Sequence, residues 1–203
     1  MKPIFYFLLF IFIPALSFSQ EFDGGLFAGL VSSQVDGDNW SGYHKTGFSA
    51  GAFVSRKISE DLGAQIELKY IRKGSFQDDK KTGANYYKSK LNYIEMPFLL
   101  NYAVNKFTFE GGMAGAVLIN SKEEDLYGEL PIDQVIDFNK IEISGVAGFN
   151  YHAWENIFIN FRFSYSLLPI RQNFSDEVVT TYYHQKYSFN NLMSFSVYYQ
   201  FQK

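Results

Sequence analysis

Large apolar residues alternate with small or polar ones along much of the chain, most clearly between Ile157 and Leu167. In this segment the odd positions hold Ile, Ile, Phe, Phe, Tyr and Leu, and the even positions from Asn160 onward hold Asn, Arg, Ser and Ser. A period of two residues indicates a β-strand with two unlike faces. Such a strand belongs to a soluble sandwich if its apolar face packs inward, and to a membrane barrel if that face meets lipid.

The same alternation recurs in segments separated by polar or turn-forming residues. It predicts eight strands, at residues 22–34, 47–57, 62–73, 89–102, 107–119, 139–151, 157–167 and 188–202. The connections between them are alternately long and short, with long ones at 35–46, 74–88, 120–138 and 168–187. Bacterial outer-membrane barrels combine an even strand number with short periplasmic turns and long external loops. The predicted fold is therefore all-β, an eight-stranded antiparallel up-and-down transmembrane β-barrel with both termini in the periplasm.

Polar and charged residues in the middle of the predicted strands share the face that carries the small residues. They are Gln65, Glu67, Lys69, Glu95, Glu110, Glu142 and Arg162. In a sandwich these residues would form the solvated face, so their presence alone leaves that alternative open. The regular segregation of loop lengths favours the barrel. The lumen of an eight-stranded barrel is just wide enough for side chains to fill, and we expect a closed plug of polar side chains without an open pore.

The N-terminus is typical of a secretory signal peptide. Lys2 supplies a positive charge, residues 4–16 are almost wholly apolar, and Ser17-Phe18-Ser19 places small residues at the −3 and −1 positions of a cleavage site. The apolar run is shorter than the roughly 20 residues of a spanning helix and contains Pro14. We therefore expect a signal peptide at residues 1–19 and a barrel domain at residues 20–203. Any membrane span of the mature chain must then be made by strands.

Composition excludes several classes of function. The net charge of −3 gives no electrostatic reason to expect nucleic acid as a partner. The chain has no cysteine, which excludes disulfides, thiolate metal sites and cysteine nucleophiles. Aromatic residues make up 19% of the chain, and many lie near predicted strand ends, as in the interfacial girdles of membrane proteins. The external set is Trp40, Tyr43, Tyr86, Tyr87, Tyr182, Tyr183 and Tyr187, and the periplasmic set is Tyr102, Tyr151 and Trp154.

Two patterns suggest chemistry only weakly. Asp36-Gly37-Asp38-Asn39 resembles the start of a calcium loop, but the glutamate expected at the twelfth position is replaced by Gly47. The three histidines, His44, His152 and His184, lie in different connections. His184 with Ser188 or Ser175 would be the candidate pair if the protein were an enzyme acting on lipid. The sequence predicts no catalytic residue, no cofactor and no bound metal.

The segment Leu91–Tyr102, with the sequence LNYIEMPFLLNY, resembles a strand of the PorT-like outer-membrane β-barrel proteins of Bacteroidetes-type bacteria. Gln65–Tyr70 resembles the preceding strand of that family, and Lys73-Gly74-Ser75 its exit. The resemblance implies an outer-membrane location and a barrel fold. The founding member of the family is linked to protein secretion, and no catalytic residues accompany the resemblance. The C-terminus departs from the barrel pattern, because Phe201 is followed by two polar residues.

Alternation places five of the charged residues on the inner face near mid-barrel depth. We expect Arg162, assisted by Lys69, to pair with Glu67, Glu95 and Glu110 and to close the lumen. The predicted function is that of a monomeric, non-enzymatic outer-membrane barrel. Its external loops would contact the outer-membrane lipid or a protein partner of the envelope or secretion machinery. The alternatives are a small barrel enzyme that acts on lipid, and a secreted soluble barrel that holds an apolar ligand among large inward-facing residues.

Overall fold

The computed structural model describes residues 22–37, 42–78, 86–131, 136–172 and 187–201. The expected signal peptide, with its cleavage site before Gln20, lies outside these residues. So do parts of all four long connections. Within the described ranges, no helix has the length and apolar character needed to cross a membrane.

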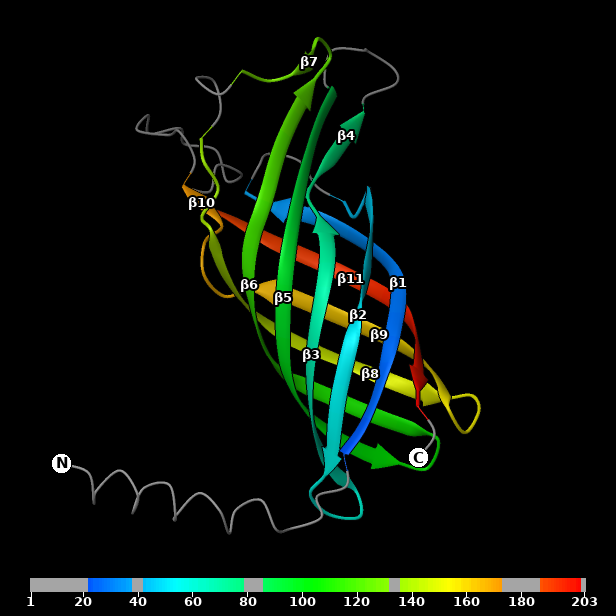
Figure 1. Ribbon diagram of the computed structural model, residues 1–203. Coiled ribbons are helices and arrows are strands. Elements are labelled where there is room, and N and C mark those ends of the chain that lie inside the picture. The colour runs from blue at the N-terminus through cyan, green and yellow to red at the C-terminus, as the bar shows by residue number, and fades with distance from the viewer. Residues whose placement is uncertain (1–21, 38–41, 79–85, 132–135, 173–186, 202–203) are drawn as a thin grey trace, which may run out of the picture.

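The described chain forms one antiparallel sheet that closes on itself (Figure 1). Its strands are β1 (Phe22–Asp36), β2 (Lys45–Lys57), β3 (Leu62–Lys73), β4 (Phe76–Asp78), β5 (Tyr86–Val104), β6 (Phe107–Asp125), β7 (Gly128–Glu129), β8 (Ile141–His152), β9 (Ile157–Ser166), β10 (Arg171–Gln172) and β11 (Tyr187–Gln200). The eight long strands make the wall, and each pairs with the next long strand along the chain. The ring closes where β1 pairs with β11, for example Leu30 opposite Phe195. The predicted eight-stranded up-and-down barrel is confirmed.

Three short turns lie at one end of the barrel, together with both ends of the described chain (Figure 1). In the β5–β6 turn Asn105 has a φ of 55°, a left-handed conformation that asparagine tolerates better than most residues. In the β8–β9 turn the backbone N–H of Ala153 donates to the carbonyl of Ile157. Because short turns face the periplasm in bacterial barrels, we assign this end to the periplasm and the opposite end to the cell exterior.

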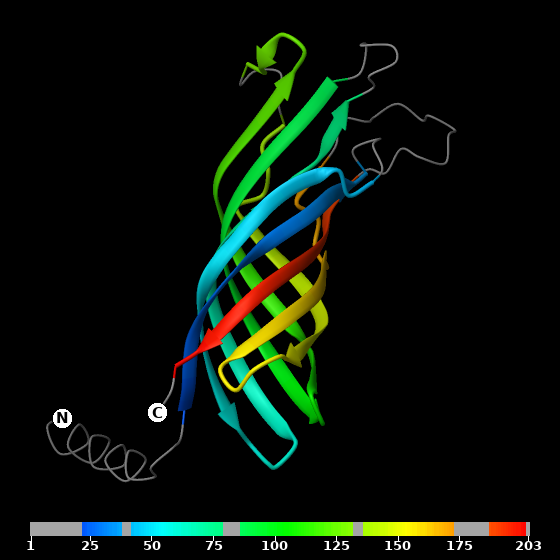
Figure 2. The ribbon, with the colours of Figure 1, turned by 90° about the vertical axis from the view of Figure 1, so that its right-hand side faces the viewer.

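β5 and β6 are longer than predicted and continue past the external rim of the barrel (Figure 2). The short strands β4 and β7 pair with these extensions, so parts of 74–88 and 120–138, which were expected to be loops, form a projecting sheet. The reason is physical. Outside the lipid, a strand needs no apolar outer face, and residues 120–125 are polar or charged on both faces. Alternation therefore cannot reveal such an extension.

Candidate functional site

The outer wall of the barrel is apolar. Large hydrophobic side chains point outward from every long strand, among them Leu26, Leu30, Ile66, Leu68, Ile94, Met96, Phe98, Leu100, Phe109, Met113, Val117, Ile141, Phe161, Phe163, Phe195 and Val197. Tyr102, Tyr151 and Trp154 are exposed near the periplasmic end, where amphipathic rings favour a membrane interface. The outer wall is thus apolar while charged side chains are buried in the lumen, the reverse of what a soluble barrel around an apolar ligand requires.

Arg162 lies at the centre of the first of two charge clusters in the lumen. Its side chain is only 2% exposed and contacts two carboxylates. Nη1 and Nη2 donate to the two oxygens of Glu67 at 2.8 and 2.9 Å. Nε and Nη2 donate to the two oxygens of Glu110 at 2.6 and 3.0 Å. The planar guanidinium thereby gives each carboxylate two hydrogen bonds, whereas a lysine ammonium has only three donors in all and could not supply these four.

Neutral side chains complete this cluster, which we call the Arg162 cluster. Tyr198 donates its hydroxyl to Glu67 at 3.0 Å, and Gln65 donates to the same oxygen at 2.7 Å. The amides of Asn150 and Asn160 donate to Glu110 at 3.2 and 2.9 Å. These donors come from strands β3, β8, β9 and β11, so the cluster ties opposite walls of the barrel together.

The second cluster is built on two lysines, and we call it the lysine cluster. Glu95 pairs with Lys69 at 3.0 Å and with Lys73 at 2.7 Å. Lys73 also reaches Glu142 at 3.0 Å. All four side chains are buried. Ser166 and Asn190 donate further hydrogen bonds to the carboxylate of Glu142, at 2.9 and 2.8 Å.

The structure corrects the expected network in two respects. Glu95 is not paired with Arg162 but with Lys69 and Lys73, so the charges divide into two clusters. Lys73 and Glu142, which the expected network omits, are members of the second cluster. The alternation already contains the signal for Lys73, since it shares the odd-numbered inner face of β3 with Gln65, Glu67 and Lys69.

Apolar layers lie on either side of the charges. Toward the periplasm, Phe27, Phe53, Phe158 and Tyr198 pack together, with Phe27 stacked on Tyr198 at 4.4 Å between ring centroids. Below this layer a cavity of about 850 Å³ opens at the periplasmic mouth. Toward the exterior, Phe138 and Ile170 pack from the loops onto inward-facing residues, namely Val31, Val35, Ile71, Leu91, Tyr93, Ala116 and Leu192.

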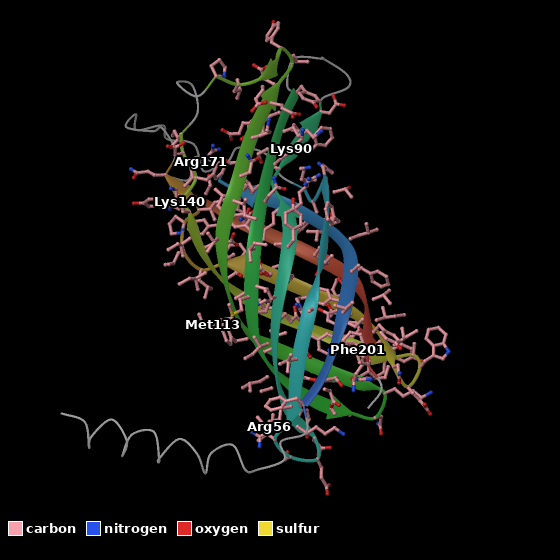
Figure 3. The ribbon with its side chains drawn as sticks, in the orientation of Figure 1. Arg56, Lys90, Met113, Lys140, Arg171 and Phe201 are labelled. Atoms are coloured by element: carbon pink, nitrogen blue, oxygen red, sulfur yellow. The ribbon has the colours of Figure 1, made fainter. Side chains whose placement is uncertain are left out.

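The projecting sheet is joined to the loops above the barrel by a further ionic contact. Arg171 of β10, labelled in Figure 3, donates to Glu123 of β6 at 2.7 Å. Its guanidinium lies over the ring of Phe138 at 4.4 Å. The hydroxyl of Tyr87 donates to the same carboxylate of Glu123. Burial, together with the charge of Glu123, raises the pKa of Tyr87, so the phenol keeps its proton and remains a donor.

The histidines and the acidic loop that suggested chemistry are separated in the structure or lie partly outside the described residues. His44 precedes the external end of β2, whereas His152 ends β8 at the periplasmic side, with Nε2 2.9 Å from Oγ1 of Thr108. His184 and Ser175 are outside the described ranges, as are Asp38 and Asn39 of the suggested calcium loop. The carboxylate of Asp36 accepts hydrogen bonds from Gln34 and Asn191. Among the described residues, no three His, Asp or Glu side chains are grouped to hold a metal ion.

An eight-stranded closed sheet with an apolar outer wall and a charged lumen defines a bacterial outer-membrane β-barrel protein. The chain belongs to the family described as the outer membrane protein beta-barrel domain, whose profile matches residues 17–172. The protein resides in the outer membrane.

Solved structures of outer-membrane proteins share this fold. Ail, the attachment invasion locus protein of Yersinia pestis, is similar with a TM-score of 0.53 and 13% identity, over 89% of this chain and 99% of that one. Neisserial surface protein A (NspA) is similar with a TM-score of 0.57 and 13% identity, over 88% of this chain and 97% of that one. At such identities the likeness concerns the fold alone. No curated protein matches the chain.

Proposed function

We propose that the protein is a monomeric, non-enzymatic and non-conducting outer-membrane barrel that holds a binding surface for an envelope protein outside the cell. The observation that carries the closed lumen is the buried guanidinium of Arg162, clamped between Glu67 and Glu110. The lysine cluster and two apolar layers occupy further levels of the same lumen. Side chains of these sizes fill the interior of an eight-stranded barrel.

The tip of the projecting sheet supports the binding role. Leu126 and Tyr127 form the turn between β6 and β7, and their side chains are 54% and 96% exposed. This turn lies at the tip of the extension that projects beyond the other strands of the barrel (Figure 2), so we expect water and not lipid around it. An exposed tyrosine is the kind of residue that anchors a protein partner, and the neighbouring leucine adds apolar contact area. The ionic contact of Glu123 with Arg171 stiffens the extension that carries them.

Because the chain resembles PorT-like proteins, we propose that it has a role in protein secretion across the outer membrane. We expect a strain that lacks the protein to be impaired in secretion, and the wild-type gene to restore it. Leu126→Ser/Tyr127→Ser should assemble normally but fail to restore secretion. Trp154→Ser, which removes an exposed aromatic at the opposite end, is the matched control and should restore it. Full restoration by the double variant would refute the role of the tip.

Conductance in planar bilayers tests the closed lumen separately. The wild-type protein should show no steady ion conductance, because no continuous aqueous path is expected past the packed layers. A stable open-channel conductance would refute the closed lumen. The alternative of a lipid-modifying enzyme is tested by incubating the purified barrel with phospholipid and with lipid A. Turnover that is lost on replacement of His184 by alanine would refute the non-enzymatic assignment.

A further inference from the structure

Four basic side chains gather at the external rim, where β2 begins, β3 ends and β5 continues outward. They are Lys45, Arg72, Lys88 and Lys90, and we call them the rim basic cluster. Arg72 of β3 pairs in register with Asn92 of β5, two residues from Lys90. Figure 3 shows Lys90 toward the external end of β5. The charges of Lys88, Arg72 and Lys90 all repel that of Lys45.

Carboxylates do not balance this cluster within the described part of the chain. Glu124 pairs with Lys90 and lies 3.9 Å from Lys88. Arg72 donates through Nε to the amide oxygen of Asn92 at 3.0 Å, a neutral partner. Four cations therefore share a single described carboxylate. Each lumen cluster, in contrast, has at least as many carboxylates as cations.

Lys45 is the member that most needs an anion. Its side chain is only 6% exposed, yet its described hydrogen bond is a long one, 3.4 Å from Nζ to the carbonyl of Thr46. The described residues include no carboxylate in ion-pair contact with it. Burying a charge without a counter-charge is costly, and a bound anion at the rim would offset that cost.

The position of the cluster along the barrel axis indicates which anion can reach it. Arg72 and Tyr70 face outward, and the guanidinium of Arg72 lies over the ring of Phe48 at 5.3 Å. From Leu62, at the periplasmic end of the same strand, Arg72 is about ten residue steps of ~3.3 Å away. With a strand tilt of about 40°, this is roughly 25 Å along the barrel axis, the height of the apolar band of such barrels. The cluster thus begins where lipid tails end and headgroup phosphates lie.

We propose that the rim basic cluster binds the phosphate group of an anionic glycolipid of the outer leaflet, with Arg72 and Lys90 as its outward contacts and Lys45 behind them. Arginine suits this contact because its planar fork matches the geometry of phosphate oxygens. The proposal rests on residence in the outer membrane and not on the closed lumen or the protein partner. Its failure is therefore distinguishable from theirs.

The test measures binding of bisphosphorylated lipid A to the folded protein in detergent. Arg72→Gln/Lys90→Gln should weaken the affinity about 25-fold, from about fivefold for each basic residue near a charged lipid surface. Arg56→Gln/Lys57→Gln is the matched control, because Arg56 also lies over a ring, that of Phe22 at 6.0 Å, at the periplasmic end. It should leave the affinity unchanged. Arg72→Lys/Lys90→Arg retains both charges and should keep most of the binding.

Two further experiments identify the ligand and test the role of Lys45. Lipid A without its phosphates should bind weakly, and millimolar inorganic phosphate should not displace lipid A. Lys45→Met should raise the unfolding midpoint of the lipid-free protein and reduce the further rise that lipid A produces. The proposal is overturned if the 72/90 glutamine variant binds like the control, or if dephosphorylated lipid A binds equally well. Displacement by free phosphate, or a lower lipid-free midpoint for Lys45→Met, also overturns it.

Discussion

Replacing Arg162 by alanine tests the energetic role of the Arg162 cluster. The change removes four hydrogen bonds, two to Glu67 and two to Glu110. It also leaves two buried carboxylates without their cation. Breaking a buried ion pair from one side costs about 3–5 kcal/mol. Tyr198, Gln65 and the two asparagine amides remain as neutral donors, which holds the expected loss within that range.

Urea unfolding of the protein in lipid vesicles, followed by tryptophan fluorescence, measures this loss. With a denaturant slope of about 2 kcal/mol/M, the midpoint should fall by roughly 1.5–2.5 M. Arg162→Lys should be intermediate, because the ammonium keeps the positive charge but cannot supply all four hydrogen bonds of the guanidinium. Lys122→Ala is the matched control. Lys122 pairs with Glu129 at 2.9 Å on the exposed extension, and such surface pairs contribute little to stability.

A combined variant separates the loss of charge balance from the loss of packing. If uncompensated carboxylates cause the instability, Arg162→Met with Glu67→Gln and Glu110→Gln should be more stable than Arg162→Met alone. The reasoning is refuted if Arg162→Ala unfolds at the wild-type midpoint. It is equally refuted if the two glutamine substitutions add to the damage of Arg162→Met.

Three other expectations follow from the same structure. Lys73→Met should destabilise the barrel more than Lys69→Met in the same unfolding assay, because Lys73 contacts two carboxylates and Lys69 one; equal losses would contradict this. The unboiled protein should migrate differently from the boiled protein in detergent gels, because a closed barrel resists detergent until heated, and identical mobility would count against closure. N-terminal sequencing of protein isolated from outer membranes should begin at Gln20, and recovery of chains that keep Met1 would disprove the cleavage site.

Alternation was sufficient to predict the barrel because lipid outside and side chains inside impose opposite demands on neighbouring residues. The bounds of β3 are those expected, residues 62–73, since its two faces follow the rule from Leu62 to Tyr70. The extensions of β5 and β6 could not be found in this way. Ser121, Lys122 and their neighbours lie in water, where neither face must be apolar, so the sequence there is typical of a loop.

For the lumen, the pattern predicts which side chains face inward but not which of them meet. Contacts across the interior depend on the stagger between strands, which a single strand's alternation does not contain. The pattern therefore leads to the expectation that Glu95 pairs with Arg162, although the stagger places Glu95 beside Lys69 and Lys73. Glu67 and Glu110 lie 43 positions apart in the sequence, and both meet Arg162.

The pairing of each long strand with the next has a consequence for how the barrel folds. Every wall contact but one joins segments close in sequence, whereas β1 and β11 meet across almost the whole chain, as in Gly25 opposite Gln200. Such long-range contacts have the largest entropic cost of loop closure and form slowly. Until this seam forms, both edge strands offer unpaired backbone groups to any other chain. The interval before closure is therefore when the chain is most prone to aggregate and most in need of the membrane or a chaperone.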